Sequence, residues 1–352
     1  MRVLVTGGAG FVGSNLAVAL QRRRPGTDVV SFDNLRRRGS ELNLPRLRAQ
    51  GVEFVHGDVR SPGDLAEAGG FDLLVECSAE PSVVRMEDGA REYLLDTNLV
   101  GALNCAEACK RHGAGMLFIS TSRIYPIALL CDACYHEEET RFVLEKRQPV
   151  AGLSQHGVSE DFPLAGARSF YGATKYGAEI LLEEYRHAFD LPVIVDRCGV
   201  IAGPWQFGKV DQGIVGFWVL SHLRGEPLNY IGFGGTGKQV RDVLHVEDFC
   251  ELVLLQIDRL DHFEGRTFNV GGGLASSVSL VELTELCREV TGQSVEIGSI
   301  AESRYADVPV YLTDGRRLEE HCGWRPRRGP RDIVRDVHDW LREQPDALLA
   351  AR

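Results

Sequence analysis

The chain begins with an apolar run that passes directly into glycines, Val3-Leu4-Val5-Thr6-Gly7-Gly8-Ala9-Gly10-Phe11-Val12-Gly13, and then into a helical pattern. Glycines at positions 7, 10 and 13 allow a tight turn, close approach of backbone N–H groups to a pyrophosphate, and close packing of the helix on the strand. The helix N-terminus then faces the phosphates. A glycine triplet also occurs in ordinary turns, but its place between a strand and a helix is typical of a dinucleotide-binding unit.

Short β-branched runs continue to alternate with amphipathic segments as far as Arg197. Strands joined by helical crossovers lie parallel, so this alternation predicts an α/β fold with a doubly wound parallel sheet (Rossmann), covered by helices on both faces. The predicted strands are Val3–Thr6, Val29–Phe32, Glu53–Val55, Leu73–Val75, Met116–Ser120 and Val193–Asp196, and the intervening helices include Ser14–Arg23 and Asn98–His112.

The pattern changes after Arg197, where glycine clusters punctuate the chain and helical patterns appear at Leu280–Thr291 and Pro330–Leu341. We therefore expect a smaller, interleaved C-terminal substrate domain. The predicted dinucleotide-binding domain comprises residues 1–200 and roughly 240–273, with an insertion at about 129–161. The predicted substrate domain comprises residues 201–239 and 274–352.

Composition excludes several classes of protein. The 352 residues carry a net charge of −11, which argues against nucleic acid or an anionic membrane as a partner. No apolar stretch is long enough for a transmembrane helix, and we expect a cytoplasmic protein. The nine cysteines fit a reducing compartment. Cys131-x-x-Cys134 with His136 lacks a second pair at zinc spacing, so we expect no metal, although metal analysis would test that pair.

The second predicted strand leads into Asp33, which lies 20 residues after Gly13. A carboxylate there accepts hydrogen bonds from the adenosine ribose and repels a 2′-phosphate, so the predicted cofactor is NAD. The arginines at 36–38 leave two alternatives open: a site for that phosphate, or a solvated loop.

At this point the sequence resembles the extended short-chain dehydrogenases/reductases along nearly its whole length. Gly57-Asp58-Val59 is similar to the adenine-contacting turn of that family, and Asp96-Thr97-Asn98 is similar to its central asparagine motif; either Asp may instead cap a helix. The resemblance implies the following cofactor-binding residues: Gly7, Gly10, Phe11, Val12, Gly13, Asp33, Asn34, Asp58, Val59, Ser78, Ala79, Asn98, Tyr171 and Lys175.

Tyr171-Gly172-Ala173-Thr174-Lys175 carries the chemistry. Residues four apart share a helix face, so the lysine can hold the nicotinamide ribose and lower the pKa of the tyrosine, which then serves as general base and acid. Alignment with the family makes Thr121 the hydroxyl beside the tyrosine, with Ser120 and Ser122 as alternatives or strand-end caps. Relatives usually have glycine after Tyr125, whereas this chain has Pro126.

The resemblance also bears on the reaction. Dehydratases of the family carry Asp-Glu directly after the threonine, and decarboxylases carry Glu two residues after it; this chain has Ser122-Arg123. Hydride removal and return then remain, which is epimerisation. The basic Arg123, Glu139–Arg141, and the segments 203–207, 211–213 and 237–245 are most similar to the CDP-paratose 2-epimerase (CDP-tyvelose epimerase) branch, which implies inversion at C2 of a CDP-sugar.

The nucleotide-diphosphate sugar is expected to contact six side chains. Arg241 and Arg304 match diphosphate-binding arginines of the family, because a diphosphate needs permanently charged, fork-shaped donors. The alternative role of Arg241 and Arg304 is in surface ion pairs. Loop packing is an equal alternative for Gln206 and Gln212, and a helix start is the alternative for Glu80. Arg197 is expected to be structural. The strand-four motif, often His-Leu-Ala in relatives, reads Glu76-Cys77-Ser78-Ala79 here. The expected substrate ligands are Glu80, Arg123, Gln206, Gln212, Arg241 and Arg304.

Two other functions stay open. A 4-epimerase or a net NAD-dependent oxidoreductase would share this fold, and a non-catalytic NAD-binding regulator would share the cofactor site. The presence of Tyr171 and Lys175 argues against the regulator. Relatives commonly dimerise through two helices per subunit, so we expect a homodimer.

Overall fold

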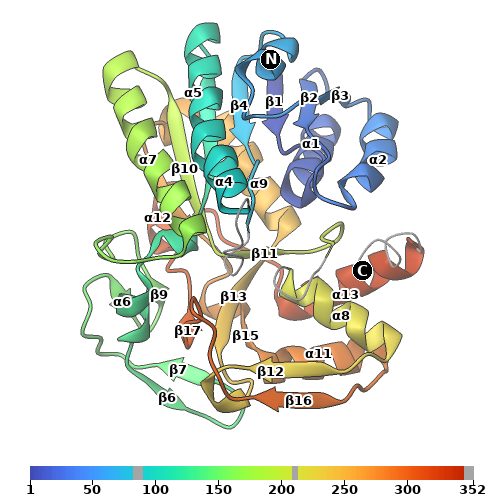
Figure 1. The fold of residues 1–352 in the computed structure, drawn as a ribbon, viewed down its shortest axis with the longest axis vertical. Coiled ribbons are helices and arrows are strands. Elements are labelled where there is room, and N and C mark those ends of the chain that lie inside the picture. The colour runs from blue at the N-terminus through green and yellow to red at the C-terminus, as the bar shows by residue number, and fades with distance from the viewer. Residues whose placement is uncertain (82–89, 208–212, 345–352) are drawn as a thin grey trace. The chain divides into compact units, whose positions relative to one another are not determined.

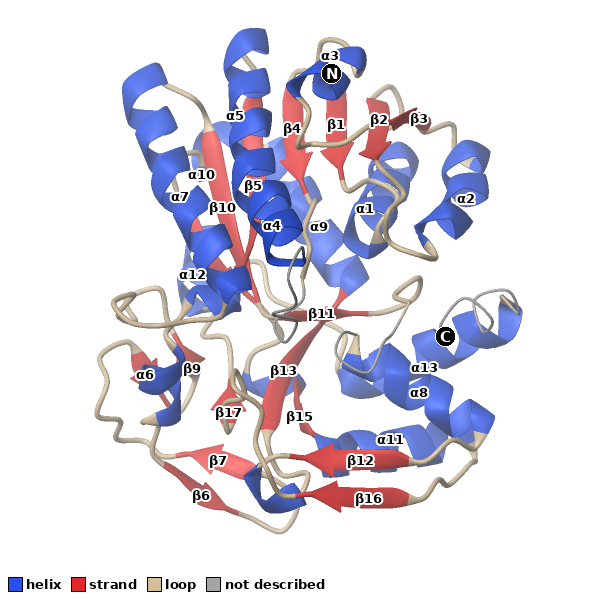
Figure 2. Ribbon diagram, viewed as in Figure 1, coloured by secondary structure: helices blue, strands red, loops and turns tan. Residues whose placement is uncertain are grey.

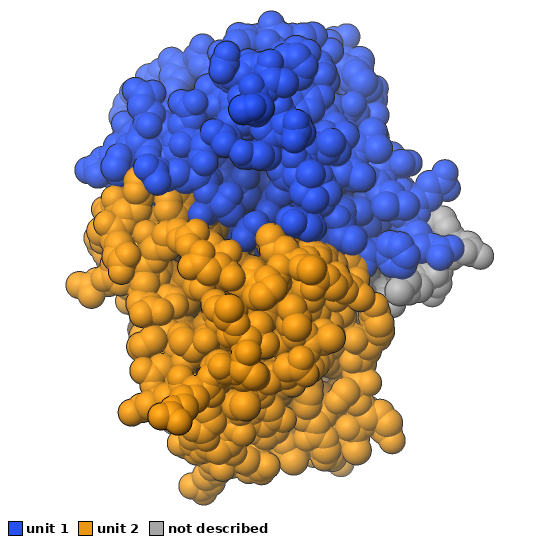
Figure 3. Space-filling view, turned by 90° about the vertical axis from the view of Figure 1, so that its left-hand side faces the viewer, with its two compact units in different colours: residues 1–121, 170–197, 250–267 blue, residues 122–169, 198–249, 268–352 orange. Residues whose placement is uncertain are grey.

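A computed structural model describes residues 1–81, 90–207 and 213–344. The chain forms two compact units (Figure 3). Unit 1 comprises residues 1–121, 170–197 and 250–267, and unit 2 comprises residues 122–169, 198–249 and 268–352. Both units are built from separate stretches of the chain.

Unit 1 is organised by a parallel sheet with the strand order β14-β10-β5-β4-β1-β2-β3 among the described residues (Figures 1 and 2). The order reverses beside β1, which is the arrangement of a doubly wound sheet. The predicted fold class is therefore confirmed, with each of the six predicted strands within two residues of its expected ends; β14 was not predicted. The strands are β1 (Arg2–Thr6), β2 (Asp28–Asp33), β3 (Glu53–His56), β4 (Leu73–Glu76), β5 (Gly115–Thr121), β10 (Val193–Cys198) and β14 (Thr267–Val270).

Helices cover both faces of this sheet. One core joins Leu4 and Phe32 of the sheet to Leu65 of α3, Cys105 of α5 and Leu182 of α7, so these three helices share a face. Helix α1 packs beside α2, and its last residue, Arg23, donates a hydrogen bond to Glu251 of α9 at 3.5 Å. No helix in the described ranges is long and apolar enough to cross a membrane. The helices are α1 (Phe11–Arg23), α2 (Leu44–Ala49), α3 (Pro62–Glu67), α4 (Ala90–Leu95), α5 (Gly101–His112), α7 (Phe170–Phe189), α9 (Val246–Asp258) and α10 (Leu260–Phe263), with a 3₁₀ turn at Ser40–Asn43 (η1).

Unit 2 contains small sheets and a group of helices. β13 pairs with β11 and β17 in parallel and with β15 in antiparallel orientation, while β12 pairs with β16. Helices α8, α11 and α13 pack together, and a Ser279–Glu282 capping box starts α11. The elements are β11 (Val200–Ala202), α8 (Ile214–Arg224), β12 (Leu228–Ile231), η4 (Phe233–Gly235), β13 (Val240–His245), η5 (Leu274–Ser276), β15 (Ser277–Ser279), α11 (Leu280–Thr291), β16 (Ile297–Ile300), β17 (Val310–Tyr311), α12 (Arg316–Cys322) and α13 (Pro330–Glu343).

The predicted insertion belongs to unit 2, although the sequence placed it within the dinucleotide-binding domain. Its Phe142 and Leu144 share a core with Val240, Val310 and Leu312, so its apolar side chains are buried against β13 and β17. Arg141 donates to Ser277 Oγ at 2.8 Å and lies 3.3 Å from Glu282. The segment contains η3 (Ser122–Ile124), α6 (Ile127–Cys131) and the hairpins β6 (Tyr135–Glu137) with β7 (Phe142–Leu144) and β8 (Leu153–Ser154) with β9 (Gly157–Val158).

Candidate active site

The glycine turn between β1 and α1 has the geometry that the sequence predicts. Gly7 has φ +62°, and a Cβ on it would lie 2.8 Å from the backbone of Cys77. A Cβ on Gly13 would lie 2.3 Å from the Gly7 carbonyl oxygen. Glycine is therefore required both for the turn and for the packing of α1 on β1.

The N-terminus of α1 is suited to an anion. Gly10 occupies the N-cap without a side-chain hydrogen bond, and no acidic residue stands in the first turn. The backbone amides of Phe11 and Val12 thus lie at a helix end that has no acidic residue in its own first turn, and such an end attracts a phosphate group. Together with the glycine turn, this cradle fits a dinucleotide.

Asp33 ends β2 and braces this turn. Its carboxylate accepts hydrogen bonds from the amides of Ala9, at 3.1 Å, and Leu35, at 2.8 Å. Burial raises the pKa of Asp33, and these amides act in the opposite direction. A carboxylate has room for further donors, so the bracing contacts are compatible with the expected ribose contact.

Asn34 and Asp58 form one hydrogen-bonded group at the same edge of the sheet. Asn34 Nδ2 donates to Asp58 Oδ2 at 2.8 Å, and Arg60 makes two side-chain hydrogen bonds to the same carboxylate. Burial opposes ionisation of Asp58, but the bonds from Arg60 and Asn34 outweigh it and lower its pKa to about 2. Val59 packs in the core, so only its backbone is available to a cofactor.

The arginine run contributes to this edge through Arg36. Its guanidinium carbon lies 3.7 Å from the centroid of the Tyr93 ring, and Arg60 lies 4.6 Å from the same centroid. Arg36 is exposed and engaged in a cation–π contact, which is compatible with the solvated loop that the sequence left open.

Asn98 fixes the chain that leaves β4. Its Oδ1 accepts from the Glu80 amide at 2.8 Å, and its Nδ2 donates to the Glu80 carbonyl at 3.0 Å and to Thr174 Oγ1 at 3.4 Å. Asn98 sits in a π-helical turn, Asp96–Val100 (η2), of the kind often found at functional sites. Asp96 is thus no helix cap, and Asn98 supports the edge of the sheet where Ser78 and Ala79 leave β4.

The hydroxyl groups of Ser120 and Thr121, at the end of β5, have different roles. Ser120 Oγ donates to the Glu179 carboxylate, which also accepts from Arg197 at 2.8 Å. All three side chains are buried, so Ser120 and Arg197 are structural. Thr121 is the last residue of β5, and its hydroxyl stays the candidate for the hydrogen bond to the substrate oxygen.

Helix α7 presents Tyr171 and Lys175 one turn apart. Lys175 is 1% exposed, and its Nζ lies 3.2 Å from Oε2 of Glu76, the last residue of β4. The same ammonium lies 4.0 Å from the centroid of the Phe118 ring. The lysine is therefore held at the carboxyl end of the sheet, where ligands of doubly wound folds bind.

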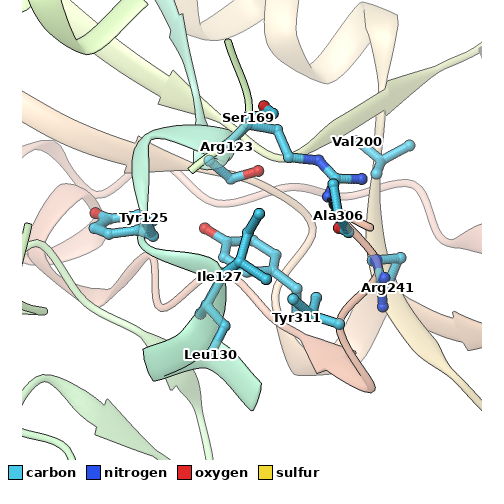
Figure 4. Close-up of a pocket in the computed structure, with 11 residues that line it drawn as sticks. Arg123, Tyr125, Ile127, Leu130, Ser169, Val200, Arg241, Ala306 and Tyr311 are labelled. Atoms are coloured by element: carbon cyan, nitrogen blue, oxygen red, sulfur yellow. Dashed lines mark hydrogen bonds between the residues drawn. The ribbon is translucent and has the colours of Figure 1, made fainter. Parts of the chain in front are cut away.

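Unit 2 has its own pocket, with a cavity volume of about 40 Å³ (Figure 4). Arg123 and Arg241 both line it, and Arg123 donates to the Ala306 carbonyl at 2.8 Å. Burial lowers the pKa of Arg241 to about 10, and repulsion from Arg123 adds to this effect. The lining residues are Ser122, Arg123, Tyr125, Ile127, Leu130, Ser169, Val200, Arg241, Ala306, Val308 and Tyr311.

Arg241 makes no direct ion pair within the described ranges. Its guanidinium donates to the neighbouring Val240 carbonyl at 2.7 Å, and the carboxylates of Asp307 and Asp242 favour its charge. Tyr311 is buried, and its hydroxyl has no well-formed hydrogen bond to the described residues. A buried cation beside a buried hydroxyl donor attracts an anion, so this pocket suits a phosphate group.

The structure does not bring the other expected substrate ligands into this pocket. Arg304 lies between β16 and β17, where its backbone amide donates to the Asp307 carboxylate at 3.2 Å. Gln206 donates to the Ile201 carbonyl of its own loop at 3.2 Å. Gln212 lies outside the described residues.

The loop after Tyr125 follows the path that proline imposes. Pro126 has φ −64° and ψ 132° and serves as N-cap of the short helix α6. The Tyr125 hydroxyl donates to Asn269 Oδ1 at 2.6 Å. Cys131 and Cys134 at the end of α6 are both exposed.

Comparison with known proteins places this site in a family. The model of the NAD dependent epimerase/dehydratase family matches residues 3–271. The chain belongs to this family. Membership confirms the prediction of an NAD-dependent enzyme of the epimerase type, and the glycine cradle described above accommodates that cofactor.

Individual relatives of the family match over their full length. The chain is 32% identical to CDP-paratose 2-epimerase from Salmonella typhi, over 97% of this chain and 99% of the relative. It is 28% identical to dTDP-glucose 4,6-dehydratase from an Actinoplanes species, over 97% and 98%. Among solved structures, UDP-glucose 4-epimerase from Thermus thermophilus in complex with NAD matches with a TM-score of 0.76 and 28% identity, over 97% and 99%.

Two side chains at these sites received no role from the sequence. Glu76 stands out only as a charge at the end of an apolar strand, and its pairing with Lys175 depends on a helix about 100 residues later. Tyr311 gives no local signal, because the pairing of β17 with β13 brings it to Arg241.

Proposed function

We propose that this enzyme is an epimerase of nucleotide-diphosphate sugars, and that it inverts C2 of a CDP-sugar by transient oxidation and re-reduction. The observation that carries the proposal is the chemistry around Thr121. Tyr171 and Lys175 supply a proton-transfer pair, whereas Ser122 and Arg123 stand where dehydratases of the family carry an acid pair. Similarity to the CDP-paratose 2-epimerase of Salmonella typhi supports the choice of sugar carbon and nucleotide.

The protein side of the mechanism follows from α7 and the end of β5. Tyr171 removes the proton of the sugar hydroxyl during oxidation and returns it after re-reduction, while the Thr121 hydroxyl hydrogen-bonds the same oxygen. Lys175 holds the nicotinamide ribose and stabilises the ionised phenol. NAD, held by the glycine cradle, Asp33 and the Asn34–Asp58 group, supplies the hydride acceptor and donor.

The substrate is held through its charge. Arg241 and Arg123, together with the Tyr311 hydroxyl, are suited to bind phosphoryl oxygens, and Arg304 is a further diphosphate ligand in this proposal. Glu80 and Gln206 are proposed sugar ligands. Arg241 carries the most weight, because its buried cation makes no direct ion pair with a carboxylate among the described residues.

Isotope transfer tests the reaction. The enzyme is incubated in D₂O with CDP-, UDP- and dTDP-hexoses, and each product is analysed by mass spectrometry and NMR. We expect inversion at C2 of the CDP-sugar, no solvent deuterium at that carbon, and no accumulation of NADH. Inversion at C4 would identify a 4-epimerase instead, and one NADH per product would identify a net oxidoreductase.

We also propose that the enzyme is a homodimer. Apolar side chains on adjacent helices of unit 1 are exposed: Leu95 at the end of α4, Val100 before α5, and Ile180 and Leu181 on α7. A second copy of this surface would cover them. Light scattering of the purified protein is expected to give twice the chain mass, and Ile180→Glu is expected to give the monomer mass; a monomeric wild type would contradict the proposal.

A further inference from the structure

Glu76 is the buried partner of the proposed catalytic lysine. Its side chain is 1% exposed, the Lys175 side chain is 2% exposed, and Lys175 Nζ to Glu76 Oε2 measures 3.2 Å. The other carboxylate oxygen, Oε1, is buried without a well-formed hydrogen bond to the described residues. A carboxylate in such a place is costly unless a cation stays beside it, so the pair holds both side chains in place.

The surroundings leave this pair as the dominant local charges. Burial raises the pKa of the Glu76 carboxyl, and the Lys175 ammonium is the main opposing influence. Among the described residues, the other titratable groups that face the pair are the thiols of Cys77 and, from α5, Cys105. Burial raises the pKa of both thiols well above the ordinary range, so both stay neutral. The aromatic ring of Phe118 faces the ammonium from β5.

We propose that Glu76 is a positioning residue, which fixes the Lys175 ammonium and moderates its support of the ionised Tyr171 phenol. The proposal rests on the proton-transfer roles given to Tyr171 and Lys175 above. A negative charge beside the ammonium offsets part of its field at the phenol. Relatives with the His-Leu-Ala motif lack this carboxylate, so the effect is specific to chains with glutamate here.

The consequence is that Tyr171 keeps its proton to higher pH than it would beside an unopposed lysine. Replacing Glu76 by glutamine removes the charge but keeps the shape and one acceptor oxygen. We therefore expect the phenol of Tyr171 to ionise at a lower pH in Glu76→Gln, by about one pH unit.

A spectroscopic titration measures this shift without any sugar substrate. Phenolate absorbance is followed against pH in the NAD-loaded protein, and the Tyr171→Phe curve is subtracted in each background. The matched control is Glu179→Gln. Glu179 is a second buried, paired carboxylate, and it lies on α7, the helix of Tyr171, eight residues further along the chain. We expect a clear shift in Glu76→Gln and less than about 0.3 unit in Glu179→Gln. No shift in Glu76→Gln, or equal shifts in both variants, would overturn the electrostatic role.

A thermal double-mutant cycle tests the positioning role even if a single variant is unstable. Lys175→Met leaves the Glu76 carboxylate buried and unpaired, and we expect its melting temperature to fall by roughly 5 °C or more. Adding Glu76→Gln to Lys175→Met is expected to restore most of that loss. Equal effects of Lys175→Met in both backgrounds would show that the pair does not couple.

These outcomes are separable from the proposed reaction. A wild-type enzyme that epimerises none of the tested sugars, but shows the titration shift and the coupling, would refute the proposed substrate and leave the role of Glu76 intact. An active epimerase without shift or coupling would do the reverse.

Discussion

The two units treat the cation at their respective sites in opposite ways. In unit 1, the Lys175 ammonium has a buried carboxylate, Glu76, at 3.2 Å. In unit 2, the Arg241 guanidinium makes no direct ion pair among the described residues; the carboxylates of Asp307 and Asp242 favour its charge, and the guanidinium of Arg123 opposes it. A buried cation is tolerated when it is neutralised, so each site shows where its neutralising charge comes from.

This difference assigns different duties to the two units. The charge of Lys175 is balanced inside the protein, which suits a group that must keep one position through many turnovers. The charge of Arg241 is left for a ligand to balance, which suits reversible binding of an anion. The four predictions below test this division, beginning with the largest effect.

Tyr171→Phe is expected to lower turnover by about 10²–10⁴-fold, because general acid–base catalysis is lost while the α7 backbone is kept. NAD content, measured by absorbance after denaturation, should be that of wild type. Tyr176→Phe on the same helix is the matched control and should retain turnover. Normal turnover in Tyr171→Phe would show that unit 1 does not supply the acid and base.

Gly13→Ala is expected to weaken NAD binding by about 100-fold, because its new Cβ would lie 2.3 Å from the Gly7 carbonyl oxygen and displace the turn. Calorimetric titration with NAD measures this change. Gly63→Ala in α3, where the nearest atom to the new Cβ lies at 3.7 Å, controls for alanine substitution. Unchanged affinity in Gly13→Ala would argue against NAD at the first glycine turn.

Arg241→Met is expected to raise KM for the nucleotide sugar by about 10–100-fold, through loss of charge-assisted hydrogen bonds, and to leave NAD affinity unchanged. Steady-state kinetics with the sugar nucleotide identified by the isotope experiment provide the measurement. Arg288→Met on the exposed face of α11 removes the same charge elsewhere in unit 2. Equal KM values for Arg241→Met and Arg288→Met would show that Arg241 does not bind the anionic substrate, and would contradict the contrast with Lys175.

The smallest effect concerns Asp196, a buried carboxyl of unit 1 that accepts a hydrogen bond from Gln256 Nε2 at 2.9 Å. Burial raises its pKa to about 7, against a normal value of 3.8. The folded state therefore holds this proton more tightly, so the contribution to stability is complete below about pH 4 and is lost as pH rises through 7. Between pH 5 and pH 8, the melting temperature of wild type should fall further than that of Asp196→Asn, by about 2 °C. Parallel curves would show that Asp196 is ionised throughout.

Much of unit 1 is predictable because its signals are local. The glycine turn, the β-branched strands and the Tyr171–Lys175 spacing each depend on residues within a few positions of one another. Unit 2 is harder to predict, because its interactions join distant segments. Phe142 belongs to unit 2 only because β13 and β17 cover it, and Tyr311 reaches the pocket only through pairing with β13.

The same reasoning explains why the sequence alone does not show which charged side chains lie together. Sequence alignment groups Arg123, Arg241 and Arg304 as ligands of one substrate, but only Arg123 and Arg241 line the pocket. Glu76 can be recognised in the sequence as a departure from the His-Leu-Ala motif, but its role depends on its ion pair with Lys175 on α7. Charge pairing between remote residues has no periodicity in the sequence, so it becomes visible only in three dimensions.

The hydrogen bonds between the Asn98 side chain and the backbone of residue 80 have a consequence for how the substrate preference of such an enzyme can change. Both hydrogen bonds are made to the main chain of Glu80, so the anchor is indifferent to the amino acid at that position. Natural selection, or a protein engineer, can exchange the side chain beside the sheet edge while the scaffold keeps its course. Saturation of position 80 is therefore a sound starting point for altering sugar preference in this fold.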